Sequence, residues 1–422
     1  MIFRSKKHLT WDTWMYCYGG KYYLYYLITD RSPGEGFGVA VSEDGVHFED
    51  LGQCIGPSDK MEFYLGTGSV WKKTDFEKSG EFICNYSEWR KDALTGANVQ
   101  NILFAHSRNL VDWTKYGDEK MFRIDETRYV KNELDGGRWD CIFPLRTETG
   151  YQGFFTATPK GYCGCGYAVS EDGVCWKAGR PPEFDLSEKG VKEGIEAGGV
   201  CIHNGRYYML MGTYCNEYGI AVMVSDKPDG VYRPQKKNFA LLANRSFRHA
   251  YFMRFFERGG SLYVNHHAIC RRENEFSRPL TYFSPIKKVT FDEEDTLRLI
   301  WSEENDLLKG KYLSAPDFDR GFIAEGIFNC GGELVFGTEN GKVGFSADIA
   351  NGVITIKEDG RTAEECRKDM TFPEGKFIFL YREGLGELYI DNYFITCYTF
   401  PEEVKQVENV ETCGVKFRRF VL

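Results

Sequence analysis

The fold is decided by the stretch Trp11-Asp12-Thr13-Trp14-Met15-Tyr16-Cys17-Tyr18-Gly19-Gly20-Lys21-Tyr22-Tyr23-Leu24-Tyr25-Tyr26. Its alternating Tyr and Leu residues are typical of half-buried strands, and Gly-Gly forms tight turns because glycine tolerates positive φ. The stretch therefore predicts two antiparallel strands joined by a tight turn. Asp12 lies near the start of the first strand, between two indoles.

Four further hairpins of this kind follow along the chain. Their turns are at Ser79-Gly80, Thr149-Gly150, Asn204-Gly205 and Gly259-Gly260. The steps between Gly19, Gly80, Gly150, Gly205 and Gly259 are 61, 70, 55 and 54 residues. An apolar strand that ends in a polar turn follows each hairpin, and the copies at 38–48 and 166–176 are nearly identical. Units of about four strands at this spacing are typical of propeller blades. We therefore predict a five-bladed β-propeller over residues 1–312.

The repeat stops after about residue 315. Short apolar strands separated by turn residues continue to the end of the chain, a pattern typical of a β-sandwich. We predict a β-sandwich domain over residues 313–422, and hence an all-β chain of two domains.

Composition excludes some classes of partner. The net charge of −9 over 422 residues argues against nucleic acid, whose binding depends on Lys and Arg neutralising phosphates. No stretch is apolar for the roughly 18–20 residues that a membrane-spanning helix needs. The aromatic content of 16% fits a sheet-rich core and also fits stacking platforms for sugars. We expect a carbohydrate as the partner, with no nucleic acid or membrane partner; the sequence does not predict the oligomeric state.

The 14 cysteines contain no paired C-x-x-C zinc spacing. The nearest cluster is Cys163-Gly164-Cys165, and most other cysteines lie within apolar strand patterns. We expect no metal or other cofactor. Residues 1–7 are charged and no apolar run follows them, so a signal peptide is not indicated. Together these features predict a cytoplasmic protein, although a leader removed upstream would make it a secreted one.

Three carboxylates occupy equivalent places in the repeat. The first strand of a blade lines the central channel, and this strand carries Asp12 in blade one, Asp140 in blade three and Glu196 in blade four. Crowded, buried carboxylates acquire separated pKa values, which glycoside hydrolysis requires. Each acid alone also has an ordinary explanation: a turn cap, an ion pair with Arg138, or a solvated surface residue. Their common register favours an active site.

The motifs around these acids resemble those of glycoside hydrolase family 32. Trp11-Asp12-Thr13-Trp14 resembles the family's Trp-Met-Asn-Asp-Pro-Asn motif, and Thr67-Gly68-Ser69 resembles its Ser-Gly-Ser motif. Arg138-Trp139-Asp140 resembles Arg-Asp-Pro, and Glu196-Ala197 resembles Glu-Cys. The order and spacing fit, but Pro and Asn are missing around Asp12, Trp139 is inserted, and Ala197 replaces Cys.

The resemblance implies a retaining, β-fructosidase-like hydrolase. Asp12 would be the nucleophile, Glu196 the acid/base and Asp140 the residue that stabilises the transition state. Substrate contacts are implied for Trp14, Ser69, Arg138, Trp139 and His249, although a structural role suits His249 equally well.

Two alternatives stay open. Family 43 enzymes resemble the same pattern but invert configuration and act on arabinosides or xylosides, with the first Asp as general base. The chain could also be a non-catalytic, carbohydrate-binding propeller, since fold alone does not fix function.

Overall fold

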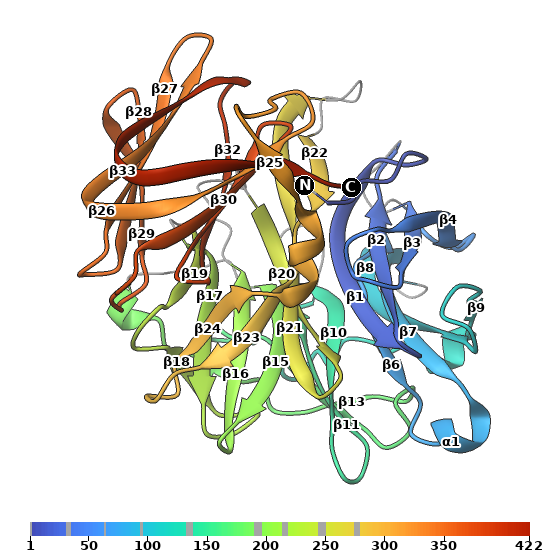
Figure 1. Ribbon diagram of the computed structural model, residues 1–422. Coiled ribbons are helices and arrows are strands. Elements are labelled where there is room, and N and C mark those ends of the chain that lie inside the picture. The colour runs from blue at the N-terminus through green and yellow to red at the C-terminus, as the bar shows by residue number, and fades with distance from the viewer. Residues whose placement is uncertain are drawn as a thin grey trace.

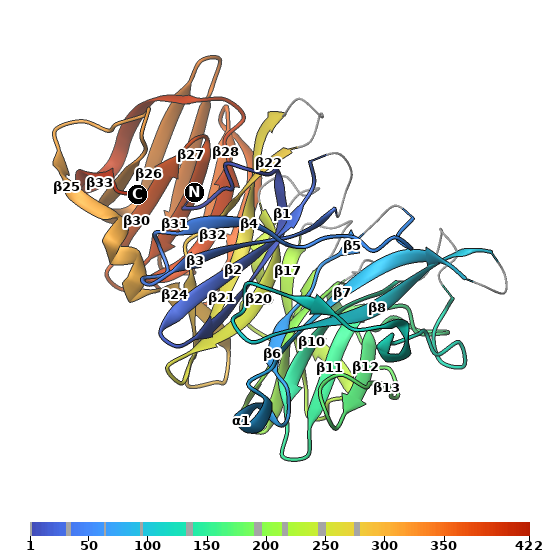
Figure 2. The same cartoon turned by 90° about the vertical axis from the view of Figure 1, so that its right-hand side faces the viewer.

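The computed structural model describes residues 2–30, 35–62, 65–92, 96–131, 138–189, 196–212, 218–243, 250–273 and 279–422. Its larger part is a series of five consecutive sheets, coloured blue to yellow in Figure 1, and its smaller part is an all-β layer coloured orange to red. The turned view in Figure 2 shows the second part packed against one side of the first. The predicted all-β character is therefore confirmed.

Each of the first three sheets places its strands largely in chain order. Sheet one contains β1 (Thr10–Tyr18), β2 (Lys21–Ile28), β3 (Gly36–Ser42) and β4 (Glu49–Ile55). Sheet two contains β5 (Leu65–Gly66), β6 (Val70–Lys72), β7 (Phe82–Lys91), β8 (Asn98–Ser107) and β9 (Thr114–Lys115), with the short helix α1 (Phe76–Ser79) between β6 and β7. Sheet three contains β10 (Trp139–Arg146), β11 (Tyr151–Ala157), β12 (Gly166–Ser170) and β13 (Lys177–Ala178).

The remaining strands form sheets four and five and the C-terminal layer. Sheet four contains β14 (Glu183–Phe184), β15 (Glu196–His203), β16 (Arg206–Gly212), β17 (Tyr218–Ser225), β18 (Val231–Pro234) and β19 (Ala240–Ala243). Sheet five contains β20 (Ala250–Arg258), β21 (Ser261–Glu273), β22 (Pro279–Phe283), β23 (Lys287–Phe291) and β24 (Leu297–Trp301). The C-terminal layer contains β25 (Lys309–Leu313), β26 (Phe322–Thr338), β27 (Lys342–Asp348), β28 (Val353–Glu358), β29 (Arg361–Arg367), β30 (Lys376–Arg382), β31 (Leu385–Ile390), β32 (Tyr393–Thr399) and β33 (Val404–Phe420).

The end of the propeller region is continuous with the C-terminal layer. Strand β24 pairs with β32 through Ile300 and Tyr393, and β25 pairs with β33. The boundary predicted after residue 312 thus falls within β25. Among the described residues, no helix is long and apolar enough to cross a membrane.

The repeat seen in the sequence is built on one recurring turn. In sheet one, Asp44 Oδ1 accepts hydrogen bonds from the backbone N–H groups of Val46 (2.9 Å) and His47 (2.8 Å). Asn109 and Asp172 make the same pair of bonds at the equivalent positions of sheets two and three. These short polar side chains accept hydrogen bonds from backbone N–H groups that would otherwise lack a partner at the turn. The turn therefore forms from local interactions and recurs at the same place in each of these sheets.

The main core lies between neighbouring sheets rather than in one central mass. Apolar clusters separate sheets one and two, two and three, and three and four; their largest buried members include Trp14, Tyr25, Tyr86, Trp139, Phe155 and Tyr232. The ring closes where residues 2 and 3 pair with Phe283 of β22, with an Ile2 N–H to Phe283 oxygen distance of 3.0 Å. Each sheet is therefore held by both neighbours, and the channel between the inner strands keeps a fixed shape.

The inner strands of all five sheets are irregular, and in three of them the irregularity lies at or beside a predicted acid. Register shifts occur between Thr10 and Thr13 of β1, between Asp140 and Phe143 of β10, and between Ala197 and Gly199 of β15. Strand β20 shifts between Tyr251 and Arg254, and residues 67–69 separate β5 from β6. Such irregularities bend a strand and re-aim its side chains, and they are common beside active sites.

A buried ionic cluster joins sheet five to the C-terminal layer. The Lys287 ammonium donates to Glu387 Oε1 and the Pro285 oxygen and lies against His266 Nε2, each at 2.7 Å. The Tyr389 hydroxyl donates to the other Glu387 oxygen at 2.8 Å, and the side chains of Lys287, Glu387 and His266 are fully buried. Burial raises the pKa of Glu387, but Lys287 and His266 outweigh it and bring this pKa down to about 2.

We expect Lys287→Met to lower the free energy of unfolding by about 3–5 kcal/mol, because it leaves a buried, uncompensated carboxylate. Urea denaturation at pH 7, where Glu387 is ionised, measures this loss. The double variant Lys287→Met/Glu387→Leu should lose much less. A double variant as unstable as the single one would contradict the importance of the unpaired charge.

Candidate active site

The three predicted acids lie together at one end of the channel. Asp12 is near the start of β1, Asp140 is the second residue of β10, and Glu196 is the first residue of β15. The Arg138 Nη2 donates to Asp140 Oδ2 at 2.8 Å and lies 3.0 Å from Glu196 Oε1. The exposed fractions of Asp12, Asp140 and Glu196 are 6%, 1% and 6%. The structure thus brings the acids of three separate sheets into one buried cluster bridged by a guanidinium.

Asp12 is held in a protonation-sensitive environment. Thr67, between β5 and β6, donates its hydroxyl to Asp12 Oδ2 at 2.6 Å. Burial and the neighbouring Glu196 raise the pKa of Asp12 to about 8, although Thr67, Arg254 and Arg138 pull it down. In the free protein this carboxyl therefore retains its proton through neutral pH.

Asp140 is fixed by a short polar chain from sheet two. The Ser87 hydroxyl donates to Asp140 Oδ1 at 2.5 Å, and Gln100 Nε2 donates to the Ser87 oxygen at 3.0 Å. A Cβ atom on Gly66 would lie 2.6 Å from Asp140 Oδ1. Glycine at position 66 therefore allows sheet two to approach this carboxylate closely.

His267 was not predicted as part of the site. Its fully buried ring lies on β21, with Nδ1 3.8 Å from Asp12 Oδ1, and it packs at 5.0 Å from the Trp11 ring. Neither ring nitrogen has a hydrogen-bond partner among the described residues. Burial, with a contribution from His266, lowers the pKa of His267 to about 3. The imidazole is therefore neutral and adds no positive charge beside Asp12.

Arg254 is a second residue that the sequence reasoning missed. This buried side chain of β20 donates to the Ala197 oxygen at 3.0 Å and the Gly198 oxygen at 2.8 Å, directly after Glu196. Its guanidinium lies 4.1 Å from the centre of the Phe252 ring and lowers the pKa of Asp12. An arginine within an otherwise apolar strand of the repeat was the available signal.

The predicted substrate contacts are distributed differently. Arg138 is at the acids, as expected. Trp139 has no exposed surface: its indole packs with Phe122 and Phe155, and its N–H donates to the Phe122 oxygen. A substrate contact by Trp139 is therefore wrong, because adjacent residues of a strand point to opposite faces and Asp140 takes the channel face.

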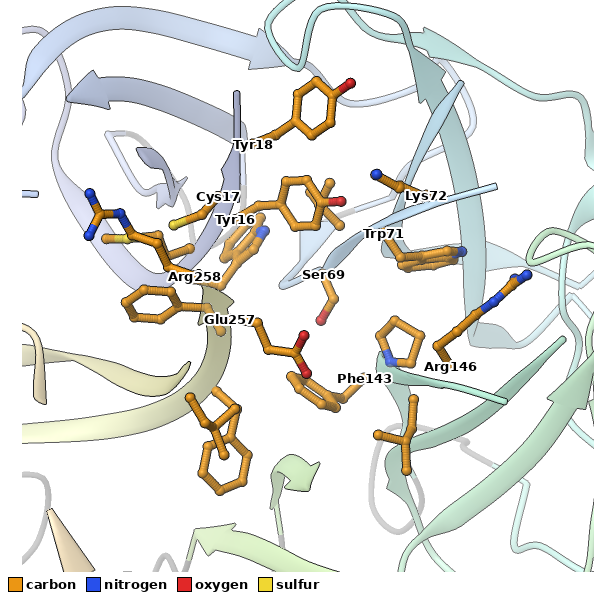
Figure 3. Close-up of a pocket in the computed structure, with 18 of the residues that line it drawn as sticks. Tyr16, Cys17, Tyr18, Ser69, Trp71, Lys72, Phe143, Arg146, Glu257 and Arg258 are labelled. Carbon is orange, nitrogen blue, oxygen red and sulfur yellow. The ribbon is translucent and has the colours of Figure 1, made fainter. Parts of the chain in front are cut away.

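Trp14 and Ser69 lie away from the acids, and His249 is outside the described residues. The Trp14 ring packs against Tyr25 and Phe37 in the core between sheets one and two. Trp14 and Ser69 both line a cavity of about 1210 Å³ that does not include Asp12, Asp140 or Glu196. Figure 3 shows this second cavity. The chemistry is assigned to the acid cluster, because three buried carboxylates meet there and at no other place within the described residues.

Comparisons with known proteins bear on the family resemblance and on the fold. Residues 11–134 match the family model described as Glycosyl hydrolases family 32 N-terminal domain. The sucrose-6-phosphate hydrolase of Lactobacillus gasseri is similar in structure with a TM-score of 0.75 at 13% identity, over 98% of this chain and 91% of that chain. No curated protein matched the sequence.

Two further solved structures resemble this chain to different extents. A family 32 β-fructofuranosidase of Bombyx mori has a TM-score of 0.73 at 12% identity, over 98% of this chain and 93% of that chain, and a variant of it was solved with sucrose. A family 43 enzyme of Xanthomonas citri has a TM-score of only 0.51 at 13% identity, over 70% of this chain and 92% of that chain. The predicted resemblance to family 32, and the propeller-plus-sandwich fold, are confirmed.

We expect Thr67→Val to move the acidic limb of the pH profile of kcat/KM to higher pH. The hydrogen bond from Thr67 stabilises the ionised form of Asp12, so its loss raises the pKa of Asp12. Activity near pH 6 should fall more than activity near pH 9. A pH profile of kcat/KM measures both effects. Thr396→Val, which removes a buried hydroxyl from the C-terminal layer, should leave the limb in place; a limb unmoved by Thr67→Val would refute the role of this bond.

Proposed function

We propose that this glycoside hydrolase, which has the N-terminal domain and the fold of family 32, releases fructose from sucrose or a β-fructan with retention of configuration. The observation that carries the proposal is the acid cluster: Arg138 bridges Asp140 and Glu196, and the charge of Glu196 acts on Asp12. Three carboxyls from three sheets converge in this one cluster.

In the first step, Asp12 attacks the anomeric carbon of the fructosyl unit. Glu196 donates a proton to the glycosidic oxygen as the bond from that oxygen to the anomeric carbon breaks. The leaving sugar departs with that proton, and the fructosyl unit stays bound to Asp12 as an ester. Thr67 bonds one Asp12 oxygen and so limits rotation of the attacking carboxylate.

In the second step, Glu196 acts as a base. It takes a proton from water, the water oxygen attacks the anomeric carbon, and the ester bond to Asp12 breaks. Asp12 is again a carboxylate, Glu196 is again protonated, and fructose leaves. Two displacements at the same carbon restore the original configuration.

Asp140 binds and stabilises the sugar ring. Its two oxygens already accept bonds from Ser87 and Arg138, so its position is set before substrate arrives. A fixed negative charge at this place favours the positive charge that develops on the ring in the transition state. Arg138 donates a hydrogen bond to this carboxylate and also lies beside Glu196, the acid/base, so it links the two groups.

The first step needs Asp12 as a carboxylate. Burial and Glu196 raise the pKa of Asp12 to about 8 in the free protein, whereas Thr67, Arg254 and Arg138 favour its ionised form.

We expect Asp12→Asn and Glu196→Gln each to lower kcat for sucrose hydrolysis by about 10²–10⁴-fold or more, because each removes a group that takes part in bond making. Release of fructose and glucose measures the rates. Glu358→Gln, a matched change in the C-terminal layer, should keep wild-type activity. Equal turnover by all three variants would refute the assignment of these acids.

The stereochemistry of the product distinguishes the family 32 mechanism from the family 43 one. Proton NMR of the first product formed should show the same anomeric configuration as the substrate. An inverted product would mean that Asp12 acts as a general base on water, as in the family 43 alternative, and not as a nucleophile.

A further inference from the structure

A second cavity occupies the opposite end of the same channel. Asp12 is near the start of β1, whereas Tyr16 and Tyr18 at the end of this strand line the cavity. The cavity lining of β1 begins at Trp14, two residues or about 7 Å beyond Asp12, and reaches Tyr18, about 20 Å beyond Asp12 at the usual rise of about 3.3 Å per residue. The buried Arg254 lies between the two regions, since it bonds the residues after Glu196 and also lines the cavity. The cavity is therefore distinct from the catalytic cluster.

Flat aromatic surfaces form much of the cavity wall. Trp71 is held by the bond from its indole N–H to the Gly173 oxygen at 3.0 Å. Phe143 of sheet three and Phe255 of sheet five pack with their ring centres 6.5 Å apart. Tyr16 of sheet one also lines the cavity. Trp71 and Phe255 are nearly buried, with exposed fractions of 4% each, whereas Tyr16 and Phe143 are partly exposed. The rings of Tyr16 and Phe143 therefore offer the apolar surface that suits the apolar face of a sugar ring, at little entropic cost.

Three polar groups point into this aromatic cavity. Figure 3 shows the Tyr16 hydroxyl, the Ser69 hydroxyl and the Glu257 carboxylate directed towards its centre from three different sheets. Within the described part of the chain, no hydrogen bond is formed by these three side-chain groups. They supply two donors and several acceptors, the pattern that vicinal hydroxyl groups need.

The charge of the cavity favours a neutral ligand. Lys73 and Arg258 are ion-paired with Glu81 and Glu304. Among the described charges at the wall, Lys72 and Arg146 are balanced by Glu77 and Glu257. Lys72 and Arg146 also lie over aromatic rings, at 4.4 Å from the Phe76 centre and 4.8 Å from the Tyr151 centre. The remaining cation of the wall, Arg254, has no carboxylate partner among the described residues, but it is buried and donates to the Ala197 and Gly198 oxygens, so it provides no accessible donor for a phosphate or a carboxylate ligand.

We infer that this distal cavity is a second carbohydrate-binding site, which takes a neutral mono- or disaccharide against the rings of Tyr16 and Phe143, with its hydroxyl groups on Tyr16, Ser69 and Glu257. The volume of about 1210 Å³ exceeds the usual 300–1,000 Å³ of small-molecule pockets and so accommodates two sugar rings. The inference does not depend on the proposed catalytic roles, because it uses none of the three acids.

The test uses the full chain carrying Glu196→Gln, which slows turnover, with fructose, glucose and sucrose as separate probes. We expect saturable quenching or enhancement of tryptophan fluorescence, since Trp71 lies in the cavity wall, and crystals soaked in sucrose should show a sugar in the distal cavity. Adding Glu257→Ala should weaken this binding at least tenfold, because a hydrogen bond to a charged group is lost.

Glu148→Ala is the matched control. Glu148 is an exposed residue of the β10–β11 turn and does not line the cavity, so this change should leave binding intact. Tyr16→Phe, which removes a single hydroxyl, provides a second variant with minimal risk to folding. A fluorescence response unchanged by Glu257→Ala and Tyr16→Phe, or sugar density confined to the acid cluster, would overturn the inference. Absence of hydrolysis by the unsubstituted chain, with distal binding retained, would instead count against the proposed catalytic function alone.

Discussion

The arrangement of this protein depends on one constraint: the inner strands of all five sheets are irregular or interrupted near their starts. Regular strands would alternate every side chain between the core and the channel. The register shifts in β1, β10, β15 and β20, and the break between β5 and β6, release that alternation. Cys141 (φ 69°) and Phe252 (φ 55°) adopt left-handed conformations at these shifts, which cost free energy and occur mainly at functional sites. Packing between neighbouring sheets holds them in place.

The acid cluster is stable because its charges are compensated from several directions. Three carboxyls in a buried space would repel one another, and two arginines from different sheets reduce that repulsion. Arg138 bonds Asp140 and Glu196 directly, whereas Arg254 acts on Asp12 while bonding backbone oxygens. Because His267 is neutral, it does not offset the burial of Asp12 and the charge of Glu196, and the pKa of Asp12 stays raised.

The C-terminal layer contributes through sheet five. Adjacent residues of β21 face opposite sides: His266 contacts the buried Lys287–Glu387 pair at the layer boundary, and His267 lies beside Asp12. The strand that borders the nucleophile is thus anchored by an ionic cluster that includes the second part of the chain. Movement of this layer would displace β21 and with it the residues behind Asp12.

The sequence determined the repeat, the all-β class and the three acids, because each depends on local patterns: turn residues such as Gly19-Gly20, alternating strands, and a common position within the unit. Only the tertiary structure decided which neighbours those acids have. Trp139, Trp14 and Ser69 share motifs with catalytic residues, yet they point to the core or to the distal cavity, since a shift of one residue changes the face of a strand. Arg254 and His267 reach the site from sheet five, more than 200 residues after Asp12 in the chain, so no local sequence pattern links them to it. They come close to Asp12 because sheet five packs beside sheet one when the ring of five sheets closes.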